Sequence, residues 1–249
     1  MTPPTNSSTQ ADVLLRVERI TKTFGRFHAL SDVSFTVRAG EVLGLIGPNG
    51  AGKTTLFECL AGVLPADSGT LCRGEHSIAP GGRSPFLFYL PDGIAPWPAQ
   101  SVRWALDFTL GFFGGPVGLR DDVIRALDLQ PLLNSRIGTL SKGQRKRALL
   151  AIGLLTPQPV LLADEPFDGL DLRQTRDVAR ALRTCAAAGR TLFLSIHQIT
   201  DAARVCDRFV LLSGGRIRGE GTLNELCAAG SPNGSSTPAD LEEVFLALT

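Results

Sequence analysis

One segment of the sequence has the residue types and the spacing of a phosphate-binding loop. It contains nine consecutive residues: Gly47, Pro48, Asn49, Gly50, Ala51, Gly52, Lys53, Thr54 and Thr55. Glycines in such a loop allow a tight turn whose backbone N–H groups face phosphate oxygens. Lys53 adds a positive charge for the β- and γ-phosphates, and the Thr54 hydroxyl is suited to Mg²⁺. The segment therefore predicts a site for a nucleoside triphosphate and Mg²⁺, with Lys53 taking part in catalysis.

Two adjacent carboxylates, Asp164 and Glu165, form a second candidate group directly after the apolar run 161–163. In open α/β sheets, ligands bind beyond the carboxyl ends of the strands, which is where this pair is expected. Asp164 is suited to hold Mg²⁺, and Glu165 can accept a proton from the water that attacks the γ-phosphate. For the pair taken alone, an acidic corner between a strand and a loop is the alternative.

The segments around these residues predict an α/β fold with a P-loop nucleotide-binding core. An apolar strand is expected at 41–46, before the loop, and a short helix at 56–61, after it. Further strands are expected at 70–72, 86–90, 160–163, 191–196 and 208–212, and helices at 172–188 and 198–205. This alternation implies a mainly parallel sheet with helices on both faces. Near-alternating apolar residues at 13–20 and 33–37 predict an N-terminal antiparallel β subdomain, with Phe24 and Phe27 in its turn.

Between about residues 96 and 156 the sequence changes character and predicts a helical insert. Helices are expected at 97–113 and 121–133, and a third one from the N-cap Ser141 to about residue 155. The resulting organisation has a disordered tail at 1–11, one large domain at 12–229, a Gly/Ser/Pro linker at 230–238 and a terminal helix at 239–249.

Composition limits the class of protein. The chain has 249 residues, of which 25 are basic and 24 acidic, and this balance argues against a dedicated nucleic-acid binder. Its five cysteines are dispersed without a C-x-x-C pair, as expected for reduced thiols. No apolar run approaches the roughly 18 residues that span a bilayer. These features predict a protein of the cytoplasm.

Three further motifs complete the pattern. Leu140 to Gln144 reads Leu-Ser-Lys-Gly-Gln and resembles the LSGGQ signature of ABC ATPases, while the segment from Asp164 to Asp171 resembles their Walker B motif and D-loop. His197, after Ser195 and Ile196, matches their H-loop. Because the motifs occur in the family's order over about residues 13–229, the chain is identified as a member of this family. The last nine residues, 241–249, are similar to the end of ATP-binding subunits of multidrug- and polysaccharide-type exporters.

The resemblance implies how the residues act. Two ATP-binding subunits meet head to tail, so that ATP on one P-loop faces the signature residues Ser141, Gly143 and Gln144, and the D-loop residue Asp171, of the other. His197 is implied to sense the γ-phosphate and to hold the attacking water; a purely structural histidine is the alternative. Phe24 is implied to stack on adenine, and the alternative is that it packs within the antiparallel sheet.

Two positions depart from the family's pattern. Lys142 replaces a glycine of the signature, which places a cation where the family approaches the phosphate closely. Asp92, after the strand at 86–90, stands where the family has the glutamine of the Q-loop. A carboxylate at position 92 can bind Mg²⁺ directly or through water, but it cannot donate a hydrogen bond as an amide does.

The function implied by the resemblance is that of an ATPase subunit on the cytoplasmic face of a membrane. It would power transport, with export favoured, through separate membrane-spanning subunits and would pair with a second ATP-binding subunit, as a homodimer. The alternatives are a soluble ABC ATPase that acts on ribosomes or DNA, and a regulatory module with little turnover. Trp104, Phe108 and Phe112 fall on one helical face and either form the core of the insert or, with Ile94 and Trp97, border the groove for the membrane subunit.

Overall fold

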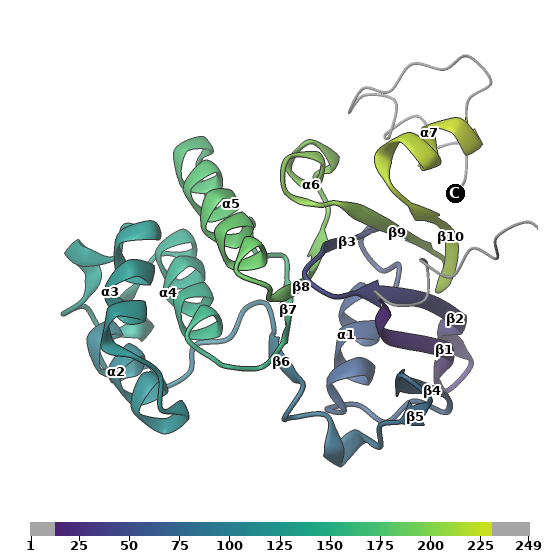
Figure 1. Cartoon of the computed structure of the whole chain (residues 1–249), viewed down its shortest axis with the longest axis horizontal. Helices are drawn as coiled ribbons and strands as arrows, with labels where there is room; N and C mark the ends of the chain where they lie inside the picture. The colour runs from purple at the N-terminus through teal and green to yellow at the C-terminus, as the bar shows by residue number, and fades with distance from the viewer. Residues whose placement is uncertain (1–12, 231–249) are drawn as a thin grey trace, which may run out of the picture.

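The computed structural model describes residues 13–230, and the core of this part is a six-stranded sheet (Figure 1). Its strands, in spatial order, are β10 (Arg216–Gly221), β9 (Arg208–Ser213), β3 (Val42–Ile46), β8 (Thr191–Ile196), β7 (Val160–Asp164) and β6 (Leu87–Leu90). All neighbours are parallel except β10, which pairs antiparallel with β9. The predicted mainly parallel α/β sheet is therefore confirmed.

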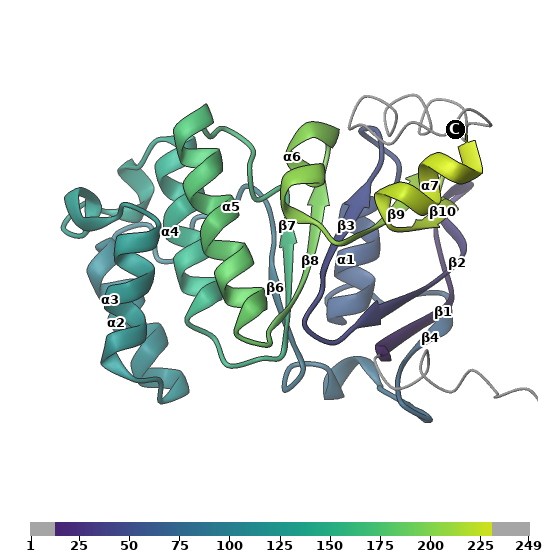
Figure 2. The ribbon, with the colours of Figure 1, turned by 45° about the horizontal axis from the view of Figure 1, so that its top comes forward.

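Alternate residues of the central strands point to opposite faces of the sheet, as a period of two requires. Val42 and Ile46 of β3 join an apolar cluster with the helices on one face, whereas Leu43 and Leu45 join a second cluster on the other. The first face is covered by α4 (Lys142–Leu154), α5 (Leu172–Ala187) and α6 (Ile199–Val205), and the second by α1 (Lys53–Ala61) (Figures 1 and 2). Burial on both faces explains why these strands are apolar throughout.

A second, antiparallel sheet packs against the α1 side of the core. Its spatial order is β2 (Phe27–Arg38), β1 (Val13–Phe24), β4 (Ser68–Arg73) and β5 (His76–Ser77). The predicted antiparallel subdomain is confirmed, but both long strands extend beyond the predicted ranges. Phe24 and Phe27 form the last pair of the β1–β2 ladder, so their predicted place in the turn is wrong.

The helical insert lies beyond the edge strand β6 and contains α2 (Val102–Phe113), α3 (Val117–Ala126) and α4. The prediction that the first helix begins at residue 97 is wrong, because Trp97 has a φ of 48° and Ser101 caps the helix by accepting from the Trp104 N–H. The second helix lies earlier than the predicted 121–133. Ser141 caps α4, as predicted. Single 3₁₀ turns occur at Pro80–Gly82, Gln130–Leu132 and Ile137–Thr139.

Two elements near the end of the described region were not predicted: the edge strand β10 and α7 (Leu223–Gly230). Apart from Gly230, which ends α7, the predicted tail, linker and terminal helix lie outside the described residues. None of the helices within residues 13–230 combines the length and the apolar character needed to cross a bilayer.

Candidate active site

The predicted phosphate loop connects β3 to α1 at the carboxyl edge of the core sheet. Gly50 and Gly52 have φ values of 81° and 106°, in the left-handed region that side chains other than glycine rarely adopt. A Cβ atom on Gly52 would lie 2.6 Å from the Ala29 carbonyl oxygen, and one on Gly47 would lie 2.4 Å from that of Leu212. Glycine is therefore required here both for the turn and for the close packing beneath it.

Lys53 is the first residue of α1, and its side chain is 6% exposed. The ammonium donates to the carbonyl oxygens of Gly47 at 2.8 Å and Pro48 at 3.3 Å. It also lies 3.6 Å from Glu165 Oε1. The loop thus holds one positive charge at the N-terminus of a helix, where the helix dipole also favours an anion.

Asp164, at the end of β7, connects three elements through hydrogen bonds. Its side chain accepts from the Thr54 hydroxyl of α1 at 2.7 Å and from the hydroxyl of Ser195, which lies opposite it on β8. The Ser195 Oγ also accepts from the Glu165 N–H at 2.9 Å. These oxygens are the donor type that Mg²⁺ prefers, and two protein ligands leave the remaining positions to phosphate oxygens and water. Thr54 and Asp164 therefore fit Mg²⁺.

Glu165 and His197 form the hydrolytic end of this group. His197 Nδ1 lies 2.7 Å from Glu165 Oε2, and the His197 side chain is partly exposed rather than packed in the core. Glu165 has a φ of 51°, which is uncommon for a residue with a side chain. The structure therefore brings together the three predicted catalytic residues, Lys53, Glu165 and His197, from the start of α1 and the ends of β7 and β8.

The signature segment lies at the N-terminus of α4. Ser141 and Gln144 form a capping box, with the Gln144 N–H donating to Ser141 Oγ at 3.3 Å and the Ser141 N–H donating to Gln144 Oε1 at 3.0 Å. A Cβ atom on Gly143 would lie 2.5 Å from the Gly169 carbonyl oxygen, so the signature packs closely against the D-loop. Asp171 caps α5 by accepting from the Gln174 N–H at 2.8 Å. The nucleotide roles of these residues stay predictions.

Asp92 and Lys142, the two departures from the family's pattern, are both engaged in ion pairs. Lys142 pairs with Asp168 of the D-loop, and Asp92 pairs with Lys146 of α4 at 2.5 Å. Burial raises the pKa of Asp92, but the hydrogen bond and charge of Lys146 outweigh this and hold it below its usual range. Asp92 lines one open cavity of about 770 Å³ together with Thr54 and Asp164. Its predicted contact with Mg²⁺ stays a prediction.

Comparisons with known proteins decide the family. Residues 30–168 match the family described as ABC transporter. The chain belongs to this family. It is 32% identical over 248 residues to the hemin import ATP-binding protein HmuV of Thermobifida fusca, covering 92% of this chain and 84% of that protein. It is 34% identical over 228 residues to the Nod factor export ATP-binding protein I of Burkholderia lata, covering 83% and 70%. A solved structure of an ATP-binding subunit of an ABC transporter superposes with a TM-score of 0.83 at 27% identity, covering 94% and 99%.

As an ABC ATP-binding subunit, the chain uses ATP and is an ATPase that works with a membrane transporter. In this ABC ATPase Phe24 ends β1 and pairs with Phe27 in the antiparallel sheet, and 49% of the residue is exposed, so its stacking on adenine stays a prediction. The Lys22 ammonium lies 5.6 Å from the centre of that ring. An exposed aromatic ring of this kind leaves a face on which adenine can stack.

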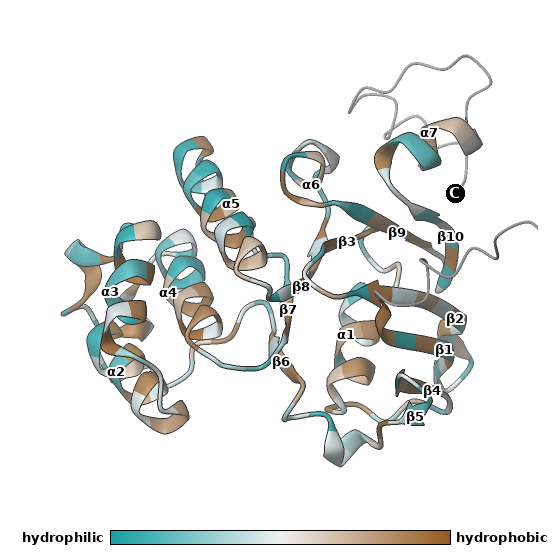
Figure 3. Cartoon of the chain, viewed as in Figure 1, coloured by the Kyte–Doolittle hydropathy of each residue, from teal (hydrophilic) through white to brown (hydrophobic). Residues whose placement is uncertain are grey.

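The aromatic residues of α2 lie outside the core. Trp104 and Phe108 stack with their ring centres 5.0 Å apart, Trp97 packs edge-on against both, and Phe112 stacks on Phe108. All four are exposed, up to 72% for Phe112, whereas the opposite face of α2 is buried through residues such as Leu106. The alternative in which they form the core of the insert is therefore wrong. We call these four residues the aromatic patch, and Figure 3 shows that α2 combines hydrophobic and hydrophilic residues.

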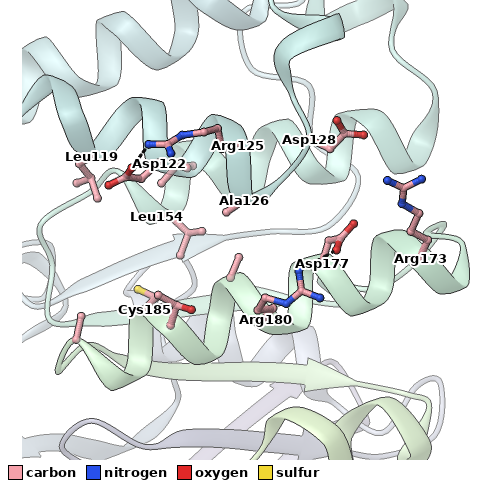
Figure 4. Close-up of a pocket in the computed structure, with 14 residues that line it drawn as sticks. Leu119, Asp122, Arg125, Ala126, Asp128, Leu154, Arg173, Asp177, Arg180 and Cys185 are labelled. Atoms are coloured by element: carbon pink, nitrogen blue, oxygen red, sulfur yellow. Dashed lines mark hydrogen bonds and ion pairs between the residues drawn. The ribbon is translucent and has the colours of Figure 1, made fainter.

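A groove of about 520 Å³ lies between α3 and α5 (Figure 4), and it contains none of the predicted site residues. Its charged side chains largely neutralise one another, because Arg125 pairs with Asp122 and Arg180 pairs with Asp177. The predicted catalytic residues Lys53, Glu165 and His197 lie instead at the carboxyl edge of the sheet.

The sequence did not indicate a functional role for two residues at this edge, Ser195 and Lys146. Ser195 enters the sequence analysis only as part of the H-loop match, although a hydroxyl in the apolar strand β8 is a visible signal. Its bond to Asp164 depends on the register between β7 and β8, which the sequence does not specify. Lys146 resembles any other basic residue of a helix, and only the structure shows that it is buried beside Asp92.

Proposed function

We propose that this chain binds and hydrolyses ATP with Mg²⁺ as a homodimer, on the cytoplasmic face of a membrane, and thereby powers export through separate membrane-spanning subunits. The observation that carries the hydrolytic part is the meeting of Lys53, Glu165 and His197 around the end of β7. A carboxylate and an imidazole held 2.7 Å apart beside the phosphate loop favour turnover over a regulatory module.

The proposed reaction follows from these side chains. Thr54 and Asp164 would hold Mg²⁺, which supplies charge neutralisation for the triphosphate. Lys53 leaves its contacts with the loop carbonyls and Glu165 to bind the β- and γ-phosphates. Glu165 accepts a proton from water as the water oxygen bonds to the γ-phosphorus and the bond to the bridging oxygen of ADP breaks. His197, 2.7 Å from Glu165 Oε2, would orient the carboxylate and contact the γ-phosphate.

The homodimer is proposed because the signature residues of one chain do not contact the phosphate loop of the same chain. Within the described residues, the contacts of Ser141, Gly143 and Gln144 are with one another and with the D-loop rather than with the phosphate loop. Ser141 and Lys142 are exposed at the N-terminus of α4, so this end can approach an anion on a second subunit. Such a dimer would place each ATP between two chains.

The membrane partner is proposed to dock on the aromatic patch. Trp97 and Trp104 are each more than a third exposed, and so is Ile94, in the loop that follows Asp92. Exposed aromatic groups of this size mark interaction sites rather than ordinary surface. A short cytoplasmic helix of the membrane subunit, with an apolar face, is the partner that fits this surface.

Export is proposed on the similarity of residues 241–249 to the ends of exporter subunits, and the Nod factor export relative is consistent with it. A hemin import relative matches to a similar degree, so the direction needs a direct test. The chain should be purified with its membrane subunits and placed in vesicles with the ATP sites outside. ATP-driven accumulation of substrate inside the vesicles would support export, and ATP-driven loss would contradict it.

The variant Glu165→Gln tests the hydrolytic mechanism. It should bind ATP as the wild type does but hydrolyse it on the order of a hundredfold more slowly, the usual scale for a lost general base. Because the closed state then cannot turn over, the variant should elute as a dimer with ATP and as a monomer without it. Hydrolysis at the wild-type rate would remove Glu165 from the proposed role, and an ATP-independent elution volume would contradict the dimer.

A further inference from the structure

Lys146 is a buried cation in the middle of a helix. Its side chain is 6% exposed, and its ammonium donates to Asp92 Oδ1 at 2.5 Å and to the Asp164 carbonyl oxygen at 3.4 Å. A buried ammonium without a counter-charge is strongly disfavoured, so Asp92 is what allows a lysine at this position. In return, Lys146 neutralises Asp92, which forms no other ion pair among the described residues.

This ion pair joins three parts of the molecule that act on ATP. Lys146 belongs to α4, the helix that begins with the signature segment, and Asp92 belongs to the loop after β6. The second acceptor is the backbone of Asp164, the residue that ends β7 and contacts Thr54. A single ammonium therefore connects the helical insert, the loop after β6 and the Walker B strand.

A second lysine–aspartate pair lies on the same face of α4. Lys142 and Lys146 are four residues apart, a spacing that places both on one side of a helix. Lys142 pairs with Asp168, whose hydrogen bond raises the pKa of the Lys142 ammonium. The two positions at which the sequence departs from the family's pattern, Lys142 and Asp92, are thus each half of an ion pair between α4 and the ATPase core. The Lys142 pair is exposed on its lysine side and screened by water, whereas in the Lys146 pair the lysine is buried and Asp92 is 39% exposed.

We propose that Lys146 is a positioning residue for ATP hydrolysis in this chain. It neutralises Asp92 and holds it at the wall of the cavity that also contains Thr54 and Asp164, and so ties the helical insert to the metal side of the ATP site. Without Lys146, an uncompensated carboxylate would face the triphosphate and repel it. The inference rests on the proposed roles of Thr54 and Asp164 at that site.

The test compares four proteins: the wild type, Lys146→Gln, Asp92→Gln and the double variant. Nucleotide affinity is measured with a fluorescent ATP analogue, with and without Mg²⁺, alongside kcat. Lys146→Gln should raise the Kd about tenfold, which corresponds to about 1.4 kcal/mol, because the charge of Asp92 remains. In the measurement without Mg²⁺, Asp92→Gln should stay within about threefold of the wild type, since its amide oxygen still accepts from Lys146. The Kd of the double variant should return to the value of Asp92→Gln, because the Asp92 carboxylate and the Lys146 ammonium are both absent.

Arg147→Gln is the matched control. Arg147 is the next residue of α4 and is equally buried, but it donates to the carbonyl oxygens of Leu127 and Asp128 within the insert. This control should lower Tm without changing the Kd for ATP. A double variant as impaired as Lys146→Gln, or a Lys146→Gln protein that loses Tm but keeps its Kd, would overturn the proposal. Lys53→Ala tests the phosphate site separately, because its ATP affinity should fall on the order of a hundredfold whatever the role of Lys146.

Discussion

Ser195 lies buried beneath the Asp164 carboxylate and supports two residues of the active site at once. Its hydroxyl donates to Asp164 Oδ1 and accepts from the Glu165 N–H at 2.9 Å. In Ser195→Ala, the charge-assisted bond to Asp164 is lost, at about 1.5–3 kcal/mol, and the Glu165 N–H is left without its acceptor, at about 1–3 kcal/mol. Asp164 keeps its bond from Thr54. We therefore expect the free energy of unfolding to fall by about 3 kcal/mol.

The same change should slow hydrolysis, because Glu165 loses the bond that fixes its backbone beside the phosphate loop. If about half of the lost energy acts in the transition state, kcat falls roughly tenfold. Thr191→Val is the matched control, since Thr191 is a buried hydroxyl at the other end of β8 that accepts from the Gly40 N–H at 2.8 Å. Urea unfolding and steady-state ATPase assays should show both variants destabilised, and only Ser195→Ala slowed. Equal kcat losses in the two variants would refute the reasoning.

Three further variants test other parts of the site. Lys53→Ala should weaken ATP binding on the order of a hundredfold, because the triphosphate loses its buried counter-charge; an unchanged Kd in equilibrium dialysis would contradict this. Asp92→Ala should raise the Mg²⁺ concentration for half-maximal ATPase activity, and Asp92→Gln should raise it less; identical Mg²⁺ curves for the two variants and the wild type would make Asp92 an ordinary loop residue. Trp97→Ala should bind ATP normally, but it should recover less of the membrane subunit in a pull-down and should uncouple transport from hydrolysis. The control Phe27→Ala, which changes an exposed aromatic residue on β2, should assemble and transport as the wild type does. Normal assembly and transport by Trp97→Ala would exclude the aromatic patch as the docking site.

Apolar runs predicted the central strands well, because a strand buried on both faces leaves a continuous signal. The predicted range 191–196 is the range of β8, and α5 ends one residue before its predicted end. The insert was harder, because its helices are short and end in local turns. Trp97 fits a helical pattern by hydrophobicity, yet its left-handed backbone places it in the loop before α2. The edge strand β10 carries three polar or charged residues in six positions, so no apolar pattern marks it.

The side chains of the candidate site were predictable to different degrees. Lys53 and Thr54 could be assigned from their spacing alone, since they follow a glycine-rich turn directly. The contact between Glu165 and His197 could be predicted only from the family's pattern, because 32 residues separate them in the chain. The contacts of Ser195 and Lys146 were not predictable. They depend on the register of two parallel strands and on the packing of α4 against the loop after β6, and both are set by tertiary structure.

The left-handed backbone of Glu165 has a consequence for the evolution and engineering of this protein. A residue with a Cβ atom held at a φ of 51° carries strain on the order of 1–3 kcal/mol, which glycine would not. The change Glu165→Gly would relieve this strain, but it would also remove the contacts of the carboxylate with Lys53 and His197, so backbone strain and side-chain contacts oppose each other at this position. The backbone of the chain is thus strained at the residue that we propose as its general base.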